Sequence, residues 1–87
     1  MNPPEIVTEG LRASFPNARI RVTNGEPTSI VVTHGRYGLS IEWYRTRGFR
    51  LTCCDGPEGD ESFVSPLALL ERAKHLLRDG YRLQRAS

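Results

Sequence analysis

Residues 29–43 of the chain, SIVVTHGRYGLSIEW, decide the fold, because two runs of alternating apolar and polar residues flank a short glycine-containing segment. Alternation with a period of two is typical of a β-strand that buries one of its faces. A two-residue type II′ turn at 35–36 suits the glycine and pairs Val32 with Leu39, so that apolar residues lie opposite each other. The segment therefore predicts an antiparallel hairpin with one apolar face.

The same alternation extends to both sides of this hairpin. Residues 18–54 as a whole predict four successive antiparallel strands, with a first connection at 24–27 that contains a glycine and a proline. A further short strand at 62–64 is left open. Each of the four strands has one apolar face and one mostly polar face, so the predicted sheet can bury only one side.

The register of the third and fourth strands depends on the loop that joins them. A three-residue loop at 46–48 gives Gly48 the positive φ that such loops require, and it places Trp43 opposite Leu51 on the apolar face. A two-residue loop would mix the two faces, so the longer loop is preferred. On the polar face the same register predicts the pairs Tyr44–Arg50 and Glu42–Thr52.

A helix is predicted at each end of the chain. Asn2 is a typical N-cap for a helix at 2–15, and Ser65, followed by a proline, is typical of the start of a helix at 65–79. Each helix has one apolar stripe, and both must cover the single apolar face of the sheet. We therefore expect one α+β domain over residues 1–87, a two-layer sandwich with the order α-β-β-β-β-α. The remaining segments are an acidic loop at 55–61 and a tail at 83–87.

The composition is that of one small globular domain, with 87 residues, 38% hydrophobic residues, 25% charged residues and a net charge of +2. Such a balanced charge argues against a dedicated nucleic-acid-binding protein. The adjacent Cys53 and Cys54 would point to opposite faces of a strand, and two cysteines of this kind favour a reducing compartment. Because the N-terminus has no signal-peptide pattern, we expect a cytoplasmic protein. No stretch is long enough to cross a bilayer, so no membrane association is expected. No motif for a cofactor or a metal is present, so neither is expected.

The polar face of the sheet is the candidate functional surface, because the helices are expected to leave it open. Tyrosine and arginine side chains on a rigid sheet are the residue types that anchor protein–protein interfaces. We therefore expect a small non-enzymatic interaction module of the adaptor, inhibitor or immunity type, with an unidentified protein partner. A solvated face that serves only the sheet is the simpler alternative. The candidate partner-binding residues are Arg21, Glu42, Tyr44, Arg45, Arg47 and Arg50.

Weak nucleic-acid binding through an arginine-rich hairpin tip is the alternative function. Arg45, Arg47 and Arg50 cluster near the third turn, and guanidinium groups bind phosphates well. Hairpin tips are commonly charged for solubility alone, so this function is the less favoured one. Pairing of two copies through the open face or a strand edge is also left open.

Two further residues bear on function. His34 could form a Cys-His-Asp grouping with Cys54 and Asp55, in which it would act as a base for a cysteine nucleophile. A whole strand separates the strand of His34 from the strand that ends near Cys54, so we do not expect an enzyme. Trp43 falls on the apolar face, where we expect it to be the largest core residue, although a gap between the helices would let it line a groove.

Overall fold

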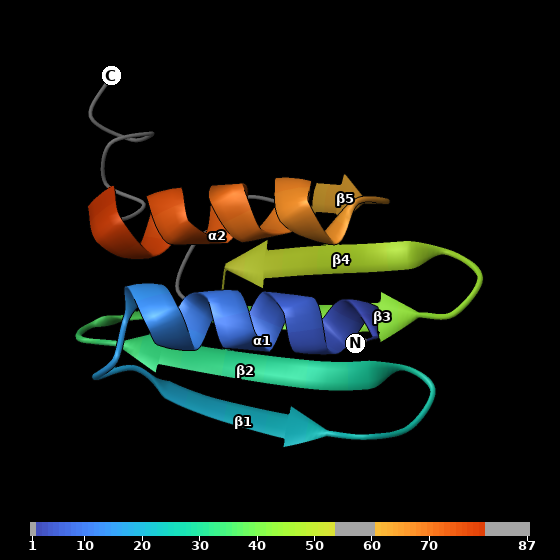
Figure 1. Cartoon of the computed structure of the whole chain (residues 1–87), viewed down its shortest axis with the longest axis horizontal. Helices are drawn as coiled ribbons and strands as arrows, with labels where there is room; N and C mark the ends of the chain where they lie inside the picture. The colour runs from blue at the N-terminus through green and yellow to red at the C-terminus, as the bar shows by residue number, and fades with distance from the viewer. Residues whose placement is uncertain (1, 54–60, 80–87) are drawn as a thin grey trace.

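The structure is a computed structural model that describes residues 2–53 and 61–79. Over these residues, two helices lie on one face of a five-stranded antiparallel sheet (Figure 1). Neighbouring strands in the chain are neighbours in the sheet, in the order β1-β2-β3-β4-β5. The α+β two-layer fold is therefore confirmed. The elements are α1 (Pro3–Ser14), β1 (Arg19–Thr23), β2 (Thr28–His34), β3 (Tyr37–Tyr44), β4 (Gly48–Cys53), β5 (Glu61–Phe63) and α2 (Pro66–Asp79).

The sheet has five strands instead of the predicted four, because the further strand left open at 62–64 is present as β5 and extends the sheet beyond β4. Its three residues are too few for alternation to identify a strand from the sequence. The pairing of Phe49 with Phe63 places two aromatic residues side by side on the helix-covered face. Gly48 allows this approach, because a Cβ atom at that position would lie 2.7 Å from the Phe63 carbonyl oxygen. Glu61, which was predicted to end the acidic loop, is the first residue of β5, and the rest of that loop lies outside the described residues.

The central hairpin has the predicted register. Val32 pairs with Leu39 and Ile30 pairs with Ile41, and all four side chains are fully buried. Gly35 has a φ of 64°, the left-handed conformation that glycine adopts without strain. The two-residue turn that the sequence predicted between β2 and β3 is therefore confirmed.

The predicted register of β3 and β4 was wrong by two residues. The structure pairs Trp43 with Phe49 and Tyr44 with Gly48, whereas the sequence had placed Leu51 and Arg50 opposite them. The loop comprises residues 45–47, and the Arg47 amide donates to the Tyr44 carbonyl oxygen over 3.2 Å. Gly48 has the predicted positive φ, 90°, but it begins β4 instead of ending the loop.

A shift by two residues keeps every side chain on its own face, so alternation alone could not exclude it. The consequence lies on the polar face, where Glu42 is opposite Arg50 and not opposite Thr52. Two oppositely charged residues thus face each other across β3 and β4.

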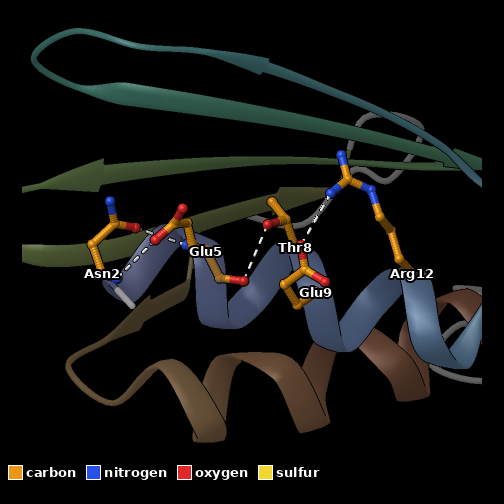
Figure 2. Close-up of polar contacts among 5 residues, drawn as sticks. All are labelled: Asn2, Glu5, Thr8, Glu9 and Arg12. Carbon is orange, nitrogen blue, oxygen red and sulfur yellow. Dashed lines mark hydrogen bonds and ion pairs between the residues drawn. The ribbon is translucent and has the colours of Figure 1, made fainter.

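Local capping explains where both helices begin. In α1 the Asn2 side chain accepts from the Glu5 amide over 2.9 Å, and the Glu5 carboxylate accepts from the Asn2 amide over 3.0 Å (Figure 2). In α2 the Ser65 hydroxyl accepts from the Ala68 amide over 3.3 Å. The helices therefore begin where the sequence predicted. The predicted tail at 83–87 lies outside the described residues.

The core lies between the sheet and the two helices. Gly10 lets α1 lie close to α2, because a Cβ atom at this position would clash with the side chain of Leu70. In Figure 1, α1 runs above β2 and β3, α2 runs near β4 and β5, and β1 lies beyond both helices. The buried apolar residues are Val7, Leu11, Phe15, Ile30, Val32, Leu39, Ile41, Phe49, Leu51, Leu69, Leu70, Ala73, Leu76 and Leu77.

Candidate interaction surface on the open sheet face

The face of the sheet opposite the helices carries rows of mostly polar side chains, two of which extend across four or more strands. Both helices pack on the other face, so neither of the two described helices covers these rows. The first row is Thr23, Ser29, Glu42, Arg50 and Ser62, and the second is Arg21, Val31, Ser40 and Thr52.

Glu42 is the centre of the first group of contacts on this face. Its Oε1 accepts a hydrogen bond from the Tyr44 hydroxyl over 3.2 Å, and it lies 3.7 Å from Nε of Arg50. Tyr44 is two residues along β3 and therefore on the same face, while Arg50 lies directly opposite on β4. The carboxylate thus joins an aromatic and a cationic side chain on adjacent strands.

Arg47 extends this group to the hairpin tip. Its guanidinium carbon lies 5.9 Å from the centre of the Tyr44 ring, which is a cation–π contact. Tyr44, Arg47 and Arg50 border a surface hollow of about 200 Å³, which Ser62 of β5 also lines. We call Glu42, Tyr44, Arg47 and Arg50 the Glu42 cluster.

Within the described residues, Arg45 makes no side-chain contact with this cluster. Its backbone amide donates to the Glu26 carboxylate over 3.4 Å, which connects the loop at 45–47 to the loop at 24–27. The two loops therefore lie at the same end of the sheet, as the predicted meander requires. The Arg45 side chain is exposed.

Arg21 lies in a different part of the open face. It is on β1, opposite Val31, and two strands separate it from Arg50. Together with Arg19 it borders a second hollow of about 460 Å³, which Val31 and Thr33 also line. The structure thus brings four of the six predicted residues together and places Arg45 and Arg21 elsewhere. Sequence reasoning missed Arg19, although its alternation with Ile20 already placed it beside Arg21 on the polar face.

The ion pair in the Glu42 cluster contributes little to folding. The Glu42 and Arg50 side chains are 33% and 50% exposed. Solvent-exposed ion pairs of this kind stabilise a protein by about 0–1 kcal/mol. The cluster can therefore be altered with little expected loss of stability, which makes it accessible to mutational tests of binding.

The Cys-His-Asp alternative has no geometric support in the described residues. The His34 ring packs against Phe15, with ring centres 4.8 Å apart, and it is half-buried. Cys54 and Asp55 lie outside the described residues. In the described part of the chain, no three His, Cys, Asp or Glu side chains are grouped to hold a metal ion.

Trp43 combines the two positions that the sequence allowed, a core residue and a groove-lining residue. It packs against the core and lies 6.4 Å from Phe49, measured between ring centres, but it is only partly buried. Its other side lines a groove of about 440 Å³ between α1 and the β1–β2 hairpin. The polar side chains of the α1 wall of this groove lie on the side of the helix nearer the hairpin (Figure 2).

Comparison with known proteins found no match among family models, curated proteins or solved structures. Neither helix in the described ranges is both long and apolar enough to span a membrane.

Proposed function

We propose that this protein is a small cytoplasmic interaction module that binds another protein through the open face of its sheet. The observation that carries this proposal is the Glu42 cluster, in which Tyr44 and Arg50 contact one carboxylate and Arg47 lies over the Tyr44 ring, on a face that neither described helix covers. Tyrosine and arginine dominate the binding energy of many interfaces, because they offer large contact areas together with hydrogen-bonding groups.

The support beneath the cluster is rigid. Phe49 and Leu51 alternate with Arg50 on β4, and their side chains are almost fully buried under the helices. A side chain whose backbone is held by a packed core loses less conformational freedom on binding than one on a mobile loop. The hollow beside Tyr44 gives a protruding partner side chain a place to insert.

Affinity capture with quantitative mass spectrometry tests the proposal. Tyr44→Ala removes the aromatic surface and Arg50→Glu places two carboxylates opposite each other, so we expect both variants to lose the proteins that the parent captures. Arg36→Glu is the matched control, since it makes the same charge change at the exposed turn between β2 and β3. Circular dichroism should show that all variants remain folded. Retention of the full set of partners by Tyr44→Ala and Arg50→Glu would contradict the proposal.

The alternative function is nucleic-acid binding through the same arginines, and one further measurement distinguishes it from protein binding. Phosphate binding would draw on Arg45, Arg47 and Arg50, and it would weaken steeply with salt. An oligonucleotide titration at low salt, followed by amide chemical shifts, should leave 45–50 unchanged if the partner is a protein. Salt-sensitive shifts in this segment would favour the alternative. Glu42 opposes that outcome, because a carboxylate at the centre of the cluster repels phosphates.

A further inference from the structure

The strand β1 forms an edge of the sheet that no other described element pairs with. It pairs with β2 without interruption from Arg19 to Thr23, and it is the first strand in the order of the sheet. In Figure 1, neither helix lies over β1. An edge of this kind presents unpaired backbone amides and carbonyls, to which an extended segment can add as a further strand.

The two faces of β1 offer different chemistry to such a segment. On the open face, Arg19 and Arg21 border the hollow of about 460 Å³. On the helix face, Val22 is 40% exposed and lines the groove of about 440 Å³, in which Trp43 contributes a large apolar surface. A strand that added to β1 would thus meet two cations on one face and apolar side chains on the other.

The three charged side chains on the α1 wall of this groove are all engaged in contacts within the helix. Glu9 and Arg12 form an ion pair of 3.4 Å, and the Glu5 carboxylate belongs to the capping box with Asn2 (Figure 2). The wall carries one net negative charge, that of Glu5, so on this face the groove favours apolar side chains against Val22 and the partly buried Trp43 over acidic ones.

A second copy of this chain is disfavoured at the edge in the longest self-pairing of β1. Antiparallel pairing of β1 with itself must match like faces, and the register centred on Arg21 places two Arg21 side chains opposite each other. The register centred on Ile20 pairs Arg19 with Arg21 twice. Like charges directly opposite each other are destabilising, so the longest self-pairing, centred on Arg21, and the shorter one centred on Ile20 are disfavoured. The equally short register centred on Val22 avoids this opposition, so the self-pairing that remains is a short one. Acidic side chains at the same positions would instead be matched.

We propose that the β1 edge binds an extended segment of a partner protein in which acidic and apolar residues alternate. The acidic residues pair with Arg19 and Arg21 on the open face, and the apolar residues extend the surface of Val22 and Trp43 on the helix face. This site is separate from the Glu42 cluster, and it stands whether or not the cluster binds a partner.

A synthetic peptide tests this proposal directly. The probe is a capped peptide, roughly seven residues long, in which glutamate alternates with valine. On titration into the 15N-labelled full chain, we expect amide chemical-shift changes centred on 19–23 and slower hydrogen exchange of the outward-facing β1 amides, because their N–H groups become paired. A peptide of the same composition with its glutamates and valines in separate blocks should bind more weakly. Replacement of glutamate by lysine should abolish binding.

The protein variants address the arginines. Arg19→Glu together with Arg21→Glu should raise the dissociation constant of the alternating peptide by roughly tenfold or more, since two cross-strand attractions become repulsions. The matched control is Arg36→Glu with Arg78→Glu, which changes the net charge equally at exposed positions away from β1. Tyr44→Ala, which should abolish binding at the Glu42 cluster, should leave peptide binding unchanged. No shift in 19–23 at low salt, shifts centred on 42–50, or equal binding of the block peptide would each overturn the proposal.

Discussion

The two edge strands of the sheet, β1 and β5, differ in length, cover and charge. β5 has three residues, and its Glu61 accepts two hydrogen bonds from the Arg72 guanidinium of α2, over 3.1 and 3.0 Å. β1 has five residues, lies outside both helices and carries two exposed arginines that form no ion pair with any other described residue. One edge is thus tied to a helix by side-chain contacts, and the other presents a longer and more accessible backbone.

We therefore expect the β5 edge to matter mainly for stability and the β1 edge to matter mainly for binding. At β5 the strand and its neighbours hold the hairpin and α2 together, so changes there should unfold the protein more easily. At β1 the side chains have weaker attachments to the core, so changes there should alter recognition more than stability.

The largest effect is expected for Gly48→Ala, next to β5. Gly48 has a φ of 90°, and a Cβ atom would lie 2.7 Å from the Phe63 carbonyl oxygen. Both the strained backbone and the displaced β5 backbone should lower the free energy of unfolding, by roughly 2–4 kcal/mol in total. Urea denaturation followed by tryptophan fluorescence measures this change.

Gly35→Ala is the matched control for Gly48→Ala. Gly35 also has a positive φ, 64°, but no atom lies within 4 Å of its virtual Cβ. The loss should be limited to the backbone term, about 1 kcal/mol. Equal losses at the two glycines would show that the close approach of β5 to Gly48 does not matter.

A smaller effect is expected for Arg72→Gln, which removes the bidentate pair between α2 and β5. The Arg72 and Glu61 side chains are 29% and 41% exposed, so solvent screens part of the interaction. We expect a loss of about 1 kcal/mol in the free energy of unfolding, and less at high salt. Lys74→Gln is the control, because the exposed Lys74–Glu71 pair within α2 should contribute roughly 0.3 kcal/mol. Equal losses for the two variants would contradict the attachment of α2 to β5.

The strand faces could be predicted from the sequence because alternation assigns each side chain to one side of the sheet. The β2–β3 turn was also predictable, since Gly35 can adopt the positive φ that a two-residue turn requires, and this turn pairs apolar with apolar residues. The β3–β4 register was not, because a shift by two leaves the faces unchanged. The ion pair of Glu42 and Arg50 therefore remained hidden until the structure placed them opposite each other.

The remaining features depend on tertiary placement. The alternation pattern puts Val22 and Ile30 on the same face, but it carries no information on how far the helices reach across the sheet. As a result, the exposure of β1 and the groove beside Trp43 could not be derived from the sequence. The short β5 likewise depends on its pairing with β4, since its three residues carry no period of their own.

The smallest effect is expected at β1 itself, for Val22→Thr. Val22 lies in the same cross-strand row as the fully buried Ile30 but is 40% exposed, so a hydroxyl in place of one methyl group can remain hydrated. The free energy of unfolding should change by less than about 0.5 kcal/mol. Val32→Thr makes the same chemical change at a fully buried position of β2, where burial of an unpaired hydroxyl should cost about 1–3 kcal/mol. Because the two substitutions are identical in shape and polarity, a comparable loss at Val22 would mean that β1 is covered in solution, and the open edge proposed as a binding site would not exist.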